Sequence, residues 1–203
     1  SQIKDNIIWT ICSGITIWSA FEILLWWSMA NGYAQVITFA SNPIWFGAIF
    51  FLIPIWESFY FYWMHRGLHT NLMYRFHALH HRNVNVGPWS GLSMHPVEHL
   101  IFLGSVVVHF VVAAHPVHIL FHLQYYALTA ATTHTGFEGM VVKDKNRVKL
   151  GTFHHQMHHR YFECNYGSLE LPWDKWFGSF HDGTVESDTK IRERRKKFTN
   201  GAK

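Results

Sequence analysis

Long apolar stretches separated by short polar segments dominate the first two thirds of the chain. Residues 7–30 form a run of 24 residues with Glu22 as the only charge, long enough to cross a hydrocarbon layer of about 30 Å. Residues 45–64 form a run of 20, interrupted by Pro54 and Glu57 and rich in aromatic residues at both ends, as membrane–water interfaces favour. A signal peptide is the alternative for the first run, but that run exceeds the usual apolar core of about 7–15 residues. We therefore predict two transmembrane helices.

A third apolar stretch, residues 100–131, is divided by His115 and Pro116 into two pieces of 15 residues each. As helices these pieces would measure about 21–24 Å, which is shorter than a perpendicular crossing. We expect a tight or partly re-entrant helical hairpin. The predicted fold class is an all-α integral membrane protein with about four transmembrane or re-entrant helices and a cytoplasmic histidine-rich helical cap.

The composition supports a membrane protein. Hydrophobic residues make up 49% and charged residues 15% of the 203 residues, whereas soluble domains carry about 25% charged residues. The net charge is +4, but only Lys4 among the 17 Lys and Arg residues precedes Arg66, and none lies between Arg82 and Lys143. Such segregation is typical of membrane topology rather than of a phosphate-binding face, so we expect no nucleic-acid partner.

The same charges predict an orientation. The segment 31–42 contains no Lys or Arg, which places it outside by the positive-inside rule and places residues 65–91, and everything from residue 134 onward, in the cytoplasm. A bacterial inner membrane or the endoplasmic reticulum fits this topology. We divide the chain into a membrane-embedded catalytic domain, residues 1–182, and a charged cytoplasmic tail, residues 183–203. The chain begins at Ser1 without an initiator methionine, which leaves open whether sequence precedes it.

Seventeen histidines stand against two cysteines, so any metal chemistry must use nitrogen rather than thiolate ligands. Cys12 and Cys164 are far apart in the sequence, and we expect both to be unpaired. Eight histidines form three clusters with helical spacing, and His134 stands alone at the end of the third apolar stretch. These nine are the candidate metal ligands: His65, His69, His77, His80, His81, His134, His155, His158 and His159.

The spacing within these clusters favours two metal ions over one. Positions i, i+3 and i+4 share one face of a helix, while adjacent residues project about 100° apart. His80 and His81 should therefore lean toward different metals, with His77 near both, and the cluster around His158 and His159 should behave alike. A structural zinc site is closed by four ligands, so nine nitrogens suit a dinuclear centre with open positions for dioxygen. Imidazole suits zinc, copper, iron or nickel, and the position beside apolar helices favours a lipid substrate.

In these histidine clusters, called histidine boxes below, the sequence resembles the integral-membrane fatty acid hydroxylase superfamily, and within it the sterol desaturase type. The resemblance rests on one H-x3-H box and two H-x2-HH boxes, and it extends to PWSGLSMHPVEH at 88–99, NYG at 165–167 and WDKWFG at 173–178, about residues 57–183 in all. It implies a non-heme centre of two Fe ions, with Zn as a possible substitute in purified protein. That centre would use dioxygen to hydroxylate or desaturate a membrane lipid. One departure from the fatty acid 2-hydroxylase pattern is Glu138, which stands four residues after His134 in place of a second histidine.

Other features complete the expectations. No heme, flavin or iron–sulfur motif is present in the sequence, so electrons should come from a separate protein, cytochrome b5-like or ferredoxin-like. His95 and His99 flank Glu98, and we expect them either to hydrogen-bond to the metal ligands or to be extra ligands. Glu57 either orients a ligating imidazole or has a packing role. His109, His115, His118 and His122 should lie near the opposite membrane face. A membrane metal transporter and a zinc-dependent membrane hydrolase are the alternative functions.

Overall fold

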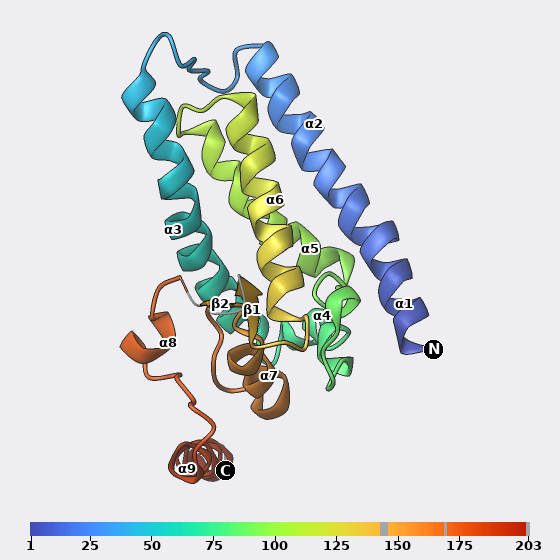
Figure 1. Cartoon of the computed structure of the whole chain (residues 1–203). Coiled ribbons are helices and arrows are strands. Elements are labelled where there is room, and N and C mark those ends of the chain that lie inside the picture. Colours follow the sequence, from blue (N-terminus) through green and yellow to red (C-terminus); the bar gives the residue numbers. More distant parts are fainter. Residues whose placement is uncertain (143–145, 169, 202–203) are drawn as a thin grey trace.

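In the computed structural model, which describes residues 1–142, 146–168 and 170–201, long helices stand side by side and smaller elements gather at one end (Figure 1). The first long helix is continuous over 29 residues and consists of α1 (Gln2–Trp9), a π-helical segment (Thr10–Ile15) and α2 (Thr16–Ala30). The second, α3 (Pro43–Leu68), has 26 residues and starts at Asn42, whose side chain accepts a hydrogen bond from the Trp45 N–H at 3.0 Å. These two helices confirm the two long apolar elements predicted from the sequence.

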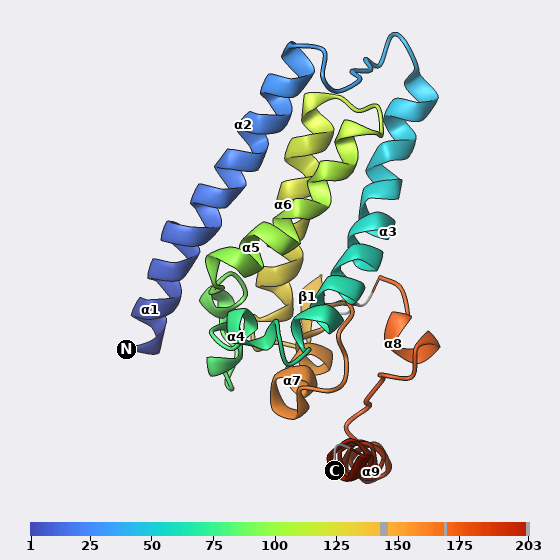
Figure 2. The ribbon, with the colours of Figure 1, turned by 180° about the vertical axis from the view of Figure 1, so that it is seen from behind.

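The predicted helical hairpin is also present. Its first limb is α5 (Pro96–Leu103) continued by a 3-10 helix (Gly104–Phe110), and its second limb is α6 (Pro116–Thr133). Pro116 occupies the first turn of α6, where its missing N–H costs no hydrogen bond. A bridge between Val36 and Ala114 ties the turn of the hairpin to the segment 31–42, so both lie at the same end of the bundle (Figure 2).

Two described helices, Gln2–Ala30 and Pro43–Leu68, are long and apolar enough to cross a membrane. Only 17% and 22% of their most apolar windows are buried inside the protein, and side chains such as Ile23, Ile44 and Phe51 point outward. So much exposed apolar surface is unusual for a soluble monomer and fits contact with lipid. The first hairpin limb, Pro96–Phe110, is apolar but shorter, and the second limb, α6, has 18 residues but is not among the two described helices that meet this criterion. The interior between the helices is filled by apolar side chains from all four long segments, among them Leu25, Ile49, Ile53, Phe102, Ile119 and Leu123.

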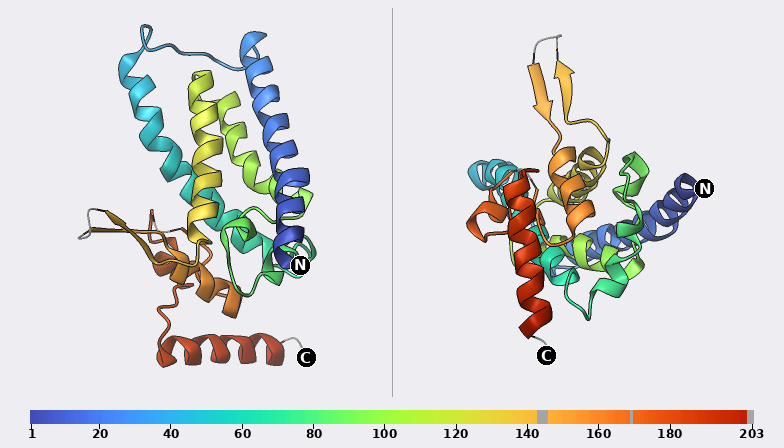
Figure 3. Two further views of the ribbon diagram at one scale, coloured as in Figure 1. Left: turned by 45° about the vertical axis from the view of Figure 1, so that its right-hand side comes forward. Right: turned by 90° about the horizontal axis from the view of Figure 1, so that it is seen from below.

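The smaller elements lie at the end of the bundle opposite the segment 31–42 (Figures 1 and 3). They are α4 (Tyr74–His77), 3-10 helices at His80–Arg82 and Pro88–Ser90, α7 (Thr152–Tyr161), α8 (Trp173–Trp176) and α9 (Val185–Gly201). The predicted tail is thus largely the helix α9, while residues 202–203 lie outside the described residues.

The prediction of an all-α fold was wrong in one place. Strands β1 (Gly139–Val142) and β2 (Asn146–Lys149) form an antiparallel hairpin in which Met140 faces Val148, and this hairpin projects sideways from the bundle (Figure 3). The β-branched valines on both strands favour extended backbone. The hairpin joins α6 to α7, so it connects two elements that carry candidate ligands.

Candidate metal centre

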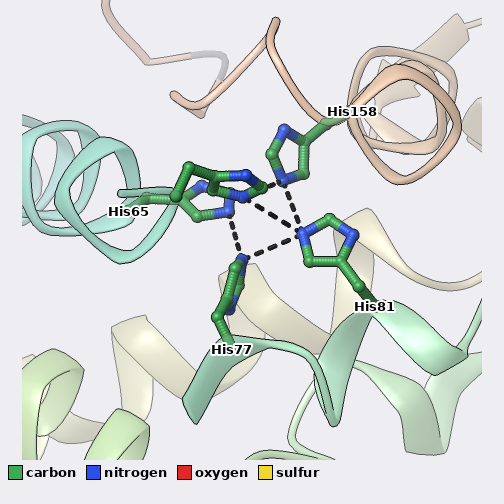
Figure 4. Close-up of side chains that lie close together, drawn as sticks. His65, His77, His81 and His158 are labelled. Carbon is green, nitrogen blue, oxygen red and sulfur yellow. Dashed lines mark hydrogen bonds between the residues drawn. The ribbon is translucent and has the colours of Figure 1, made fainter. Parts of the chain in front are cut away.

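The nine predicted ligands converge in two adjacent sets at one end of the bundle. The first set comprises His65, His69, His77, His81 and His158; the second comprises His80, His134, His155 and His159. Within each set, one ring nitrogen of every residue lies within 4.8 Å of the others. Figure 4 shows four rings of the first set pointing toward one another.

Four separate stretches of chain supply these rings. His65 lies in the last turn of α3 and His69 follows as its C-cap, while His134 is the C-cap of α6. The third and fourth stretches are the segment from α4 to the 3-10 helix at His80–Arg82 and the helix α7. All nine rings are buried except His69, which is half-buried.

The paired histidines divide between the two sets as the spacing predicts. His81 belongs to the first set and His80 to the second, and His158 and His159 divide in the same way. His77, expected near both, is grouped with the first set only. The segment from His77 to His81 is not a single regular α-helix, because α4 ends at His77 and a 3-10 helix begins at His80.

Hydrogen bonding at the far side of several rings fixes where their protons lie. Nδ1 lies 2.7 Å from the Tyr166 carbonyl in His65, 2.7 Å from the Cys164 carbonyl in His158 and 2.7 Å from the Ala130 carbonyl in His134. A carbonyl oxygen only accepts, so each Nδ1 carries the proton, and Nε2 of the neutral ring presents a lone pair. These lone pairs point into the two sets.

The close approach of Nε2 atoms cannot be explained by hydrogen bonds alone. In the first set, Nε2 of His69, His81 and His158 form a triangle with 3.1 Å sides. Three hydrogen bonds would need three protons. Nε2 of His158 carries none, and Nε2 of His69 and of His81 carry at most one each, so the three contacts cannot all be hydrogen bonds. A cation between the nitrogens would satisfy all three, and imidazole–metal bonds of about 2.1 Å at right angles place neighbouring nitrogens about 3 Å apart. The residues therefore fit a metal ion.

The second set has similar spacing. Nε2 of His159 lies 3.3 Å from Nε2 of His134 and 3.1 Å from Nε2 of His155. Burial lowers the pKa of His134 to about 4, and burial together with the nearby His65 lowers the pKa of His69, in the first set, to about 2. Both rings are therefore neutral near pH 7, which is the form that binds metal.

A buried carboxylate supports the first set. Glu98 Oε1 lies 2.6 Å from Nδ1 of His77, and both side chains are fully buried. A carboxylate behind a ligating imidazole fixes its tautomer and orientation. Of the flanking histidines, His95 caps α5 by accepting from the Val97 N–H at 3.1 Å, and His99 Nδ1 lies 2.8 Å from Ser13 Oγ. Neither belongs to the two described sets.

Glu57 does not contact a candidate ligand as one alternative expected. Its Oε2 lies 2.9 Å from Nε2 of His122, and His122 Nδ1 lies 3.1 Å from Nε2 of His109. His118 Nε2 donates to the Phe46 carbonyl at 3.0 Å. These hairpin histidines form separate pairwise contacts rather than a convergent group within the described residues.

A cavity adjoins both sets between α3 and α6. Its free volume is about 40 Å³, and its lining includes His65, His80, His134, Phe61 and Phe102. That volume admits water or a diatomic gas. Because the exposed Glu170 and the half-buried Tyr125 also line it, the cavity reaches the protein surface beside α6.

Comparison with known families gives the class of this protein. The fatty acid hydroxylase family matches residues 49–179, more than half of the chain, so the chain belongs to that family. The resemblance expected from the histidine boxes is thereby confirmed.

The named relatives are sterol enzymes. The chain is 35% identical over 129 residues to lathosterol oxidase of Mus musculus, a match covering 62% of this chain and 42% of that protein. It is 30% identical over 173 residues to Delta(7)-sterol-C5(6)-desaturase of Nicotiana tabacum, covering 79% and 60% respectively. The chain thus spans roughly half the length of the curated relatives it matches. No solved structure matches it.

Proposed function

We propose that residues 1–182 form the catalytic domain of a membrane-bound non-heme diiron oxygenase that hydroxylates or desaturates a lipid. The observation that carries this proposal is the convergence of nine histidine rings into two adjacent sets whose ring nitrogens face one another. Five nitrogens in one set and four in the other would hold one ion each. The names of the relatives support a sterol as the lipid.

Iron bound in the two sets would supply the dioxygen-dependent oxidation of an unactivated C–H bond. The chain itself fixes the ligands before any ion binds, because Glu98 and the carbonyls of Tyr166 and Cys164 hold the outer nitrogens of three rings. The apolar walls of the cavity, among them Phe61 and Phe102, would exclude water and position an aliphatic carbon. Whether hydroxylation or desaturation follows depends on that positioning.

Location at the end of the bundle supports a substrate that stays in the bilayer. The two sets lie where α3 and α6 end, so a lipid beside these helices can reach the cavity without leaving the membrane. In this proposal the histidine sets face the cytoplasm, and a separate cytochrome b5-like or ferredoxin-like protein supplies electrons there. The charged segment 183–203 would remain a cytoplasmic tail.

The two alternative functions make different demands on the site. A metal transporter needs ligands along the depth of the bilayer, whereas both described sets lie at one end of the helices. A zinc hydrolase needs neither dioxygen nor reductant. Zinc in purified protein would not by itself exclude iron, since affinity order and metal supply can favour the wrong ion.

Lipid analysis with isotopically labelled dioxygen tests the proposal. Cells or membranes containing the chain, supplied with a reductase system, should yield a lipid that gains one labelled oxygen or loses two hydrogens. The His80→Ala variant should yield neither, although it inserts in the membrane. Product formation without dioxygen, or label from water instead, would contradict the proposal and indicate a hydrolase.

A further inference from the structure

Glu57 is a buried carboxyl group in a helix long enough to cross the membrane. Its side chain is 4% exposed and lies on α3, eight residues before His65. Burying an acid at such a position is costly and is often tied to function. Only one of its oxygens has a partner among the described residues: Oε2 lies 2.9 Å from His122, whereas Oε1 is buried without a hydrogen bond.

The partner of Glu57 is itself held in place. Nε2 of His122 also lies 3.1 Å from Ser105 Oγ, and its Nδ1 lies 3.1 Å from His109. These contacts join α3, α6 and the 3-10 helix Gly104–Phe110. The Glu57 carboxyl group is therefore held through Oε2, and Oε1 is its oxygen without a hydrogen-bond partner among the described residues.

The cavity beside the histidine sets is the space that Glu57 also lines. Two other polar side chains in its wall have partners: Ser58 Oγ lies 3.3 Å from Ser168 Oγ, and the Tyr125 hydroxyl donates to Glu170 at 2.8 Å. Much of the remaining wall is apolar, including Phe61 and Phe102. Glu57 thus belongs to this lining and carries one buried oxygen, Oε1, that has no hydrogen-bond partner among the described residues.

We propose that Glu57 binds the hydroxyl group of a lipid alcohol and thereby selects the substrate and positions it. This inference rests on the proposed lipid-oxidising function and names a specificity-determining residue for it. A hydroxyl group can donate a hydrogen bond, which is what the carboxylate oxygen Oε1 lacks. An anionic headgroup beside the same carboxylate would be repelled, and an ester or ether would provide no donor.

The position of Glu57 also constrains where oxidation occurs. Eight residues of α-helix correspond to about 12 Å along α3, and both Glu57 and His65 line the cavity. A lipid bound to Glu57 by its hydroxyl group would present a distant carbon to the histidine sets. Oxidation should therefore fall far from the hydroxyl group.

Equilibrium binding of lathosterol and of its 3-O-methyl ether to the full chain in nanodiscs tests the role of Glu57. The two probes differ in the hydroxyl donor, and a hydrogen bond to a charged group is worth about 10-fold or more in affinity. Wild-type protein should prefer lathosterol at least about 10-fold. Glu57→Ala should lower that ratio to near 1, and Glu57→Gln, which keeps an acceptor oxygen, should give an intermediate ratio.

Glu22→Gln is the matched control, because Glu22 is another glutamate in an apolar helix but accepts from Trp18 Nε1 at 3.0 Å and does not line the cavity. Its ratio should equal that of wild type. The inference would be overturned if wild type bound both probes equally, or if Glu57→Ala left the ratio unchanged. It would also be overturned if lathosterol did not bind, or if the product were oxidised beside the hydroxyl group. Binding needs neither dioxygen nor electrons, so hydroxyl selectivity without oxidation would count against the proposed function alone.

Discussion

Two histidine pairs with the same spacing behave differently in this molecule. His65 and His69 at the end of α3 belong to the first convergent set, whereas His118 and His122 within α6 do not belong to either set. In the second pair each ring nitrogen has its own partner: His118 accepts from the His115 N–H and donates to the Phe46 carbonyl, and His122 contacts Glu57 and His109.

For the rings whose Nδ1 contacts a carbonyl, which are His65, His134 and His158, the difference lies in that nitrogen. Where a carbonyl holds the proton on Nδ1, as in His65, Nε2 is left as a lone pair directed at other lone pairs. Where both nitrogens have separate partners, the histidine is a structural group that links helices. Helical spacing brings rings to one face, but the proton arrangement decides whether they form a metal site.

Removing a convergent ring should have the largest effect. His158→Ala removes one of the three Nε2 atoms of the triangle, so we expect loss of metal from the first set. Lipid oxidation should fall by more than the roughly 10- to 100-fold that is typical when a group hydrogen-bonded to a metal ligand is lost. Metal analysis and product assays measure both. His122→Ala is the matched control and should retain its metal content. Metal loss in that variant would contradict the conclusion that the second pair has a structural role rather than a metal-binding one.

Weakening the support of a convergent ring should have an intermediate effect. Glu98→Ala removes the carboxylate behind His77, and we expect metal affinity to fall about 10- to 100-fold. Glu98→Gln should lose less because its amide oxygen still accepts a hydrogen bond. Competition with a chelator gives the affinities, and unchanged affinity in Glu98→Ala would show that the 2.6 Å contact does not support metal binding.

Disrupting the structural pair should have the smallest effect on the site. His118→Ala removes the hydrogen bond that the ring donates to the Phe46 carbonyl and the ring contacts with Phe46 and Phe50. We expect a loss of about 1–3 kcal/mol in the free energy of unfolding, with unchanged metal content per folded chain. Thermal unfolding with parallel metal analysis checks this; metal loss at full stability would contradict it.

The sequence predicts much of this arrangement. Apolar run lengths identify the two long helices and the hairpin, and the spacing of paired histidines predicts that His80 and His81 separate, as do His158 and His159. These features are local, so they depend little on tertiary contacts. Neither cysteine forms a disulfide, as expected.

Features that depend on distant contacts were not predicted. The carbonyls of Tyr166 and Cys164 reach the rings because Phe162 and Asn165 adopt left-handed backbone conformations, with φ of 66° and 52°, which the side-chain pattern does not reveal. Glu57 contacts His122 because the hairpin packs against α3, a pairing across 65 residues. The β1–β2 hairpin was missed because its strands have four residues each, too few for a clear alternating pattern.

The most direct test of the central claim is the number of metal ions per chain after expression with added iron and purification without chelator, combined with absorption spectroscopy at the iron edge. The two histidine sets predict close to two irons per chain, each with nitrogen ligands. A maximum of one ion per chain, or iron without histidine ligands, would contradict the account.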